Sequence, residues 1–185
     1  MRQTLIATVE NKPGVLNRVA SLFRRRNFNI NSLNVGRTEK PDVSRMTIVV
    51  DSRDTEARLV EANLYKLVNV LDVQDVTHQP AVFRELALIK VSANQERRSE
   101  IISLADVFKG KIIDICSESL IIQITGTEER IDSLIELLTP CGILEIVRTG
   151  HVAMTRGTAD GVRHTPGAGR KVGVNGHNGK VTVVE

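Results

Sequence analysis

The stretch TLIATVENKPGVL, residues 4–16 of a chain of 185, is the most informative about the fold because it joins two patterns with different periods. Residues 5, 7 and 9 are apolar and residues 4 and 8 are threonine, and this period of two predicts a β-strand over 2–10. The break Asn-Lys-Pro-Gly follows, and apolar residues then recur at helical spacing from Val15 to Phe23. The chain is therefore predicted to open with a strand, a tight turn and an amphipathic helix.

The rest of the sequence extends this opening into a six-element unit that occurs twice. Strand-like segments follow at 28–35 and 44–50, a second helix is expected to begin near Asp54, and a strand at 68–77 completes the order βαββαβ. The same order begins again with the strand-like segment at Leu86. The sequence therefore predicts an α+β fold of two tandem ferredoxin-like βαββαβ domains.

Composition divides the chain into three parts. We expect a first domain at 1–79, a second at 80–154 and a flexible tail at 155–185, which holds seven of the 13 glycines. The tail has too few apolar residues to offset the entropy of ordering it. It also carries the whole formal net charge of +3, because acidic and basic residues balance in the first two parts. This balance argues against a partner nucleic acid.

The cysteines and the hydropathy pattern bear on the compartment. Cys116 and Cys141 form neither a CxxC pair nor a disulfide framework, so we expect two buried thiols in a reducing environment. No stretch approaches the roughly 20 apolar residues of a membrane helix, and the N-terminus does not resemble a signal peptide. We therefore expect a soluble, cytoplasmic protein with no membrane partner.

The turn from Asn11 to Leu16 is the strongest candidate site. Amides in the first turn of a helix have no intrahelical acceptor and face the positive end of the helix dipole, so they suit a small carboxylate. Gly14 would let a ligand approach the backbone, and Asn11 offers a donor and an acceptor. A plain turn and helix cap is the alternative reading.

Asn29 is the second candidate, because an amide inside a strand is disfavoured unless it has a specific partner. It could bind an ammonium group or a partner loop, or it could simply cap the preceding turn. Each domain is also small, and a four-stranded sheet covered by helices on one face leaves the other face open. We expect Ile6, Ile30 and Ile48 on that open face, and therefore a homodimer.

Other function classes find less support. No catalytic motif is present, so no catalytic residue is predicted, and the four histidines are too scattered to predict a metal site. An RNA-binding βαββαβ module would need aromatic residues in its first and third strands, which have none. An amino-acid-responsive transcription regulator would need a DNA-reading element, and none is evident. These two classes remain the alternatives.

Several motifs together resemble a known family. The turn at 11–16 and the Phe28-Asn29-Ile30 segment are similar to an ACT domain, a module that senses small molecules in amino-acid metabolism. Five further segments resemble the regulatory (small) subunit of acetohydroxyacid synthase, also called acetolactate synthase, and together the motifs cover the chain to about residue 157: 44–48, 67–70, 85–91, 108–114 and 148–150.

The resemblance implies a non-catalytic subunit of the branched-chain amino-acid pathway. It implies that the chain activates a catalytic large subunit, which would carry thiamine diphosphate, Mg and FAD, and that it confers feedback inhibition by valine, leucine or isoleucine. It also implies a valine site between the first domains of a dimer. One copy would contribute Asn11, Pro13, Gly14, Val15 and Leu16, and the neighbouring copy Asn29 and Ile30.

The second repeat has no Pro-Gly turn, since Asn94-Gln95-Glu96-Arg97 stands at the matching place. We therefore assign it to assembly, to activation or to a different effector.

Overall fold

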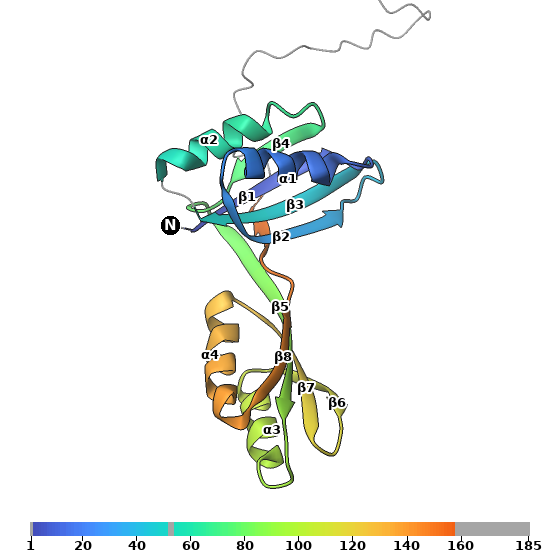
Figure 1. Cartoon of the computed structure of the whole chain (residues 1–185), viewed down its shortest axis with the longest axis vertical. Helices are drawn as coiled ribbons and strands as arrows, with labels where there is room; N and C mark the ends of the chain where they lie inside the picture. Colours follow the sequence, from blue (N-terminus) through green and yellow to red (C-terminus); the bar gives the residue numbers. More distant parts are fainter. Residues whose placement is uncertain (1, 52–53, 158–185) are drawn as a thin grey trace, which may run out of the picture.

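The computed structural model describes residues 2–51 and 54–157 and shows two domains joined by a long strand (Figure 1). The first domain contains β1 (Arg2–Glu10), α1 (Val15–Arg25), β2 (Asn29–Arg37), β3 (Val43–Asp51), α2 (Asp54–Leu64) and β4 (Val70–Asp75). The second contains β5 (Ala81–Ser92), α3 (Arg98–Val107), β6 (Lys111–Ile115), β7 (Ser119–Gly126), α4 (Glu128–Leu138), the 3₁₀ turn η1 (Thr139–Cys141), β8 (Ile143–Arg148) and β9 (Val152–Thr155). The α+β fold with two βαββαβ units is confirmed.

Both sheets are antiparallel and have the same strand order. The first runs β2-β3-β1-β4 and the second β6-β7-β5-β8. In each domain the apolar stripes of two helices and the alternate residues of the central strands form one buried core. The β2 strand therefore lies at an edge of the first sheet, with one row of backbone groups left without a neighbouring strand of this chain.

The expected open face of the first sheet is only partly correct. Ile48 pairs with Leu5 in the ladder and faces the helices, and Ile30 also packs against that core. Only Ile6 lies on the other face, where Val76 and Ala153 of the same chain bury it. The prediction was wrong for two of the three isoleucines. The register between strands determines which face of the sheet a side chain lies on, and this register cannot be read from the sequence.

The strand β5 is longer than the predicted 86–91 and serves two sheets. Its last part pairs with β7 and β8, whereas Ala81–Arg84 pairs with β9 to form a two-stranded ribbon. Phe83 and Ala153 on the inner side of this ribbon pack near Ile6. The end of the second domain therefore returns to cover the sheet of the first.

The thiols differ from the expectation. Both cysteines are free, but Cys116 is exposed and Cys141 is half-buried. Cys116 lies in the turn between β6 and β7, where its amide donates to the Ser119 carbonyl, and so its side chain is not part of the core. Most of the predicted tail, from residue 158 onward, lies outside the described residues.

Candidate functional site

The turn between β1 and α1 has an open backbone at its centre. Gly14 precedes α1 with a φ of 82°, a conformation that glycine adopts at little cost. A Cβ atom at this position would meet no atom of the described chain within 4 Å. The backbone is thus accessible to a ligand at the point where the helix begins.

The first turn of α1 carries uncompensated positive character. The amide of Val15 donates to Lys12 over a long 3.4 Å, and within the described residues the amides of Leu16 and Asn17 have no acceptor. The first turn contains no acidic residue, and no side chain caps it. Together with the helix dipole, these free donors favour a bound carboxylate.

Asn11 ties the turn to the loop between β2 and β3. Its side-chain Nδ2 donates to the Pro41 carbonyl at 2.9 Å, and its backbone amide donates to the Asp42 carbonyl at 2.7 Å. One of the two Nδ2 hydrogens is therefore engaged within the chain. The side-chain oxygen and the second Nδ2 hydrogen of Asn11 remain for a ligand.

The Glu10 carboxylate, which directly precedes this turn in sequence, is bound by other side chains of the chain. The Glu10 side chain accepts from Asn69 Nδ2 at 2.5 Å and from Lys12 Nζ at 3.1 Å, and Arg18 in turn donates to Asn69 Oδ1 at 2.5 Å. The hydrogen bond from Asn69, assisted by Lys12, lowers the pKa of Glu10. Glu10 thus stays ionised and bound to its own partners, so it does not occupy the helix N-terminus.

Asn29 and Ile30 lie at the opposite end of the same sheet. Asn29 pairs with Asp51, which pairs with Arg2 at the start of β1, whereas Asn11 follows the end of that strand. Nine strand residues at about 3.3 Å each separate the two groups by roughly 30 Å. The structure therefore brings Asn11, Pro13, Gly14, Val15 and Leu16 together, but Asn29 and Ile30 can reach them only from a second copy.

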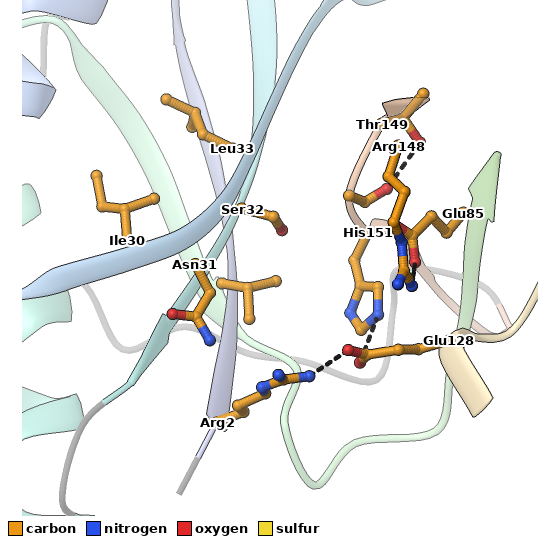
Figure 2. A pocket seen from close by; sticks show the side chains of 12 residues that line it. Arg2, Ile30, Asn31, Ser32, Leu33, Glu85, Glu128, Arg148, Thr149 and His151 are labelled. Atoms are coloured by element: carbon orange, nitrogen blue, oxygen red, sulfur yellow. Dashed lines mark hydrogen bonds and ion pairs between the residues drawn. The ribbon is translucent and has the colours of Figure 1, made fainter. Parts of the chain in front are cut away.

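A cleft of about 620 Å³ between the two domains was not predicted from the sequence. Figure 2 shows Ile30, Asn31, Ser32 and Leu33 of β2 on one side and the segment after β8 on the other. Glu128 at the start of α4 binds Arg2 of β1, and its carboxylate lies 3.2 Å from His151 Nε2, close enough for an ion pair when that imidazole is protonated. This carboxylate therefore links the first strand of one domain to the last turn of the other.

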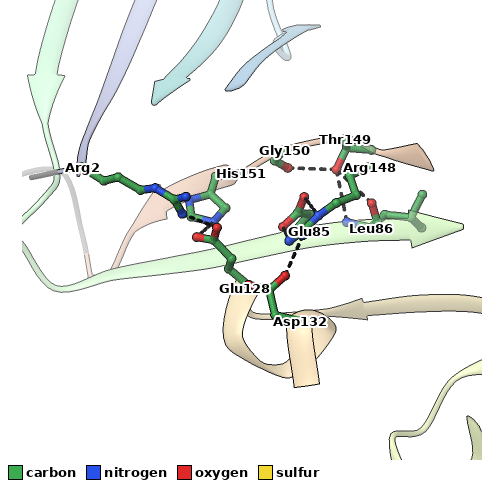
Figure 3. A network of polar contacts seen from close by, with 9 residues as sticks. All are labelled: Arg2, Glu85, Leu86, Glu128, Asp132, Arg148, Thr149, Gly150 and His151. Atoms are coloured by element: carbon green, nitrogen blue, oxygen red, sulfur yellow. Dashed lines mark hydrogen bonds and ion pairs between the residues drawn. The ribbon is translucent and has the colours of Figure 1, made fainter. Parts of the chain in front are cut away.

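A second ionic group stabilises the cleft from the side of the second domain (Figure 3). Arg148 donates to both oxygens of Glu85, at 2.8 and 2.7 Å, and to Asp132 at 2.6 Å. The Glu85 side chain is only 4% exposed and that of Arg148 is 30% exposed. The hydrogen bond to Glu85 raises the pKa of Arg148, so the guanidinium stays charged.

Neither a metal site nor a membrane-spanning helix is found in the part of the chain that the structure describes. There, no group of three or more His, Cys, Asp or Glu side chains is placed to hold a metal ion. In the same residues, no helix is long and apolar enough to cross a membrane.

The fold and the open β1–α1 turn define the class of protein. Residues 5–72 match a family model described as the AHAS (acetohydroxyacid synthase) small subunit-like ACT domain. Residues 84–157 match a model described as the small subunit of acetolactate synthase. The first domain is thus of the ACT type, and the two matches together cover most of the chain.

Individual relatives agree with this class. The chain is 49% identical to a probable acetolactate synthase small subunit of Archaeoglobus fulgidus, covering 85% of this chain and 98% of that protein. It is 48% identical to the acetolactate synthase small subunit of Mycolicibacterium smegmatis, covering 83% and 91%. The crystal structure of the small subunit from Thermotoga maritima matches with a TM-score of 0.79 at 42% identity, covering 85% and 99%. The chain belongs to the family of acetolactate synthase small subunits.

Proposed function

We propose that this chain is the non-catalytic regulatory subunit of an acetolactate synthase, which activates the catalytic large subunit and makes it sensitive to valine or to leucine or isoleucine. Family membership supports the association with a large subunit, which would carry the thiamine diphosphate, Mg and FAD of the reaction. The pathway is one of the cytoplasm, where we place the complex.

The open β1–α1 turn is the observation that carries the proposed effector site. The free amides of Leu16 and Asn17 at the start of α1 would bind the effector carboxylate. The Leu16 side chain beside them is 45% exposed, and it offers apolar contact to an aliphatic side chain. A branched-chain amino acid has both of the groups that this turn recognises.

A homodimer completes the proposed site. If the β2 edges of two copies pair antiparallel about a two-fold axis, Asn29 of one copy lies near the Arg37 end of the other. That end of the sheet also holds the β1–α1 turn, because Asn11 is bonded to the loop between β2 and β3. We accordingly propose residues 1–79 as the effector domain and 80–154 as the domain for assembly or activation.

Reconstitution with the large subunit tests this function. We expect the wild-type chain to raise acetolactate formation and to make it valine-sensitive, and Asn29→Ala to keep the activation but lose the inhibition. Asn34→Ala is the matched control, since Asn34 lies on the same strand outside the proposed site. Normal inhibition of the Asn29 variant would refute the site, and absence of activation by the wild type would refute the function.

A further inference from the structure

A close backbone approach between the domains lies two residues beyond Ile30. Gly150, between β8 and β9, has a φ of 74°, and a Cβ atom built there would lie 2.5 Å from Ser32 Cβ and 2.8 Å from Ser32 Oγ. Only glycine satisfies both the backbone conformation and this approach. The backbone of the second domain therefore lies in direct contact with β2 of the first.

This part of β2 needs outside support. The ladder between β2 and β3 shifts register between Ile30 and Ser32, so Asn31 is bulged out of the pairing. Before the bulge only Asn29 and Ile30 are paired with β3, and β2 is an edge strand. Its conformation there is weakly determined by the sheet alone.

Two further links join the same segment of the second domain to the first. Arg2 binds Glu128, whose carboxylate lies 3.2 Å from His151 Nε2 (Figures 2 and 3). Arg45 Nη2 donates to the Ala153 carbonyl at 3.0 Å. Arg2 is also the first residue of the ladder that continues through Asp51 to Asn29. Residues 150–153 are therefore linked to the start of β2 in two ways. Gly150 contacts β2 directly, and Glu128 connects His151 to Arg2, whose strand is joined to β2 through β3.

We propose that the segment Gly150–Ala153 is a positioning element for Asn29 and Ile30, so that the second domain sets the affinity of an effector that it does not touch. The inference rests on the proposed effector site and names its regulation. A displacement of this segment, for example on docking to the large subunit, would move β2 and change effector affinity, and linkage makes the effect reciprocal.

The contact between Ser32 and Gly150 would position β2 by steric fit and not by a hydrogen bond. Within the described residues, Ser32 Oγ is buried without a hydrogen-bond partner, as is His151 Nδ1. Loss of the Ser32 hydroxyl should therefore leave the positioning intact, whereas an added methyl group at residue 150 should displace β2.

Calorimetric titration of the full chain with valine tests this. Gly150→Ala is expected to weaken valine binding about tenfold, within the usual range of coupling between sites. Gly157→Ala is the matched control, because Gly157 has a similar φ of 84° but nothing within 4 Å of its Cβ position, and it should bind as wild type. Adding Ser32→Gly to Gly150→Ala should restore most of the affinity, and Ser32→Ala alone should not change it.

The outcomes separate this inference from the proposed function. Wild-type affinity in Gly150→Ala, or a loss that Ser32→Gly does not repair, would overturn the inference while the effector site stands. A wild-type chain that does not bind valine would overturn both.

If circular dichroism shows that Gly150→Ala does not fold, Glu128→Gln replaces it, with Glu136→Gln on the same helix as control. Weaker binding in the Glu128 variant alone supports the positioning role, and equal binding in both overturns it.

Discussion

The two repeats have the same topology but use the turn before their first helix in opposite ways. In the first repeat, Gly14 precedes α1, the first turn holds no acid, and the amides of Leu16 and Asn17 have no acceptor among the described residues. In the second, Asn94 Oδ1 accepts from the Arg97 amide at 3.0 Å, and Glu100 lies in the first turn of α3. The first helix end is open to an anion, and the second is already compensated by its own chain.

The charged side chains show the same contrast. Arg98 donates to the carbonyls of Ala93, Cys116 and Ser117, and so it joins strand ends of the second domain. Arg18, near the open turn of the first domain, donates among the described residues to a side-chain amide alone, that of Asn69. Polar groups thus stabilise the fold in the second repeat, while in the first some are left for a partner.

The largest expected effect comes from removing an internal charge of the second repeat. Arg148→Ala leaves the Glu85 carboxylate buried and unpaired, so we expect the free energy of unfolding to fall by about 3–5 kcal/mol. Arg18→Ala in the first repeat removes a bond to a neutral amide and should cost about 1 kcal/mol. Urea denaturation of the full chain measures both, and equal losses would contradict the contrast between the repeats.

An intermediate effect is expected from making the open turn resemble the closed one. Asn17 occupies the third position of α1, which corresponds to Glu100 in α3. Asn17→Glu should stabilise the helix by about 0.3–1 kcal/mol through the dipole and at the same time weaken valine binding. Glu100→Asn should lose a similar stability without affecting valine. Thermal unfolding and titration of both variants test this, and unchanged valine affinity in the Asn17 variant would argue against a carboxylate at these amides.

The smallest effect concerns pH. Because its hydrogen bond from Asn69 lowers the pKa of Glu10 below the usual 4.5, the ionised form favours the folded state. This contribution is present above pH 4.5 and is lost as the pH falls below it. At pH 7 the melting temperature of the wild type should therefore be slightly higher than that of Glu10→Gln. This difference in melting temperature should vanish at low pH. A difference that grows on acidification would contradict the assignment.

Local patterns were sufficient to predict most of the fold. The period of two in β1, the Pro-Gly break and the helical stripe from Val15 to Phe23 depend on neighbouring residues only, and they gave the order of elements. The faces of Ile30 and Ile48 were predicted wrongly, because the register of β3 against β1 and β2 fixes them.

The candidate site was predicted only where its residues are neighbours in the sequence. The open turn is contiguous in sequence, so its amides could be expected from the motif alone. The interdomain cleft depends on pairs such as Arg2 and Glu128, 126 residues apart, and on the approach of Gly150 to Ser32. Neither produces a periodic pattern in the sequence, although a glycine between two strands, such as Gly150, indicates a position where the backbone conformation is unusual.

The most direct test of the account is calorimetric titration of valine into the wild-type chain, Gly14→Asp and Gly14→Asn. Asp and Asn have nearly the same size and both tolerate a positive φ, so the two variants differ chiefly in charge beside the free amides. We predict that the wild type binds, that the Asn variant stays within about tenfold of it, and that the Asp variant is weaker by about a hundredfold or more, equivalent to about 2.7 kcal/mol. Equal affinities of the Asp and Asn variants would contradict carboxylate recognition at the start of α1.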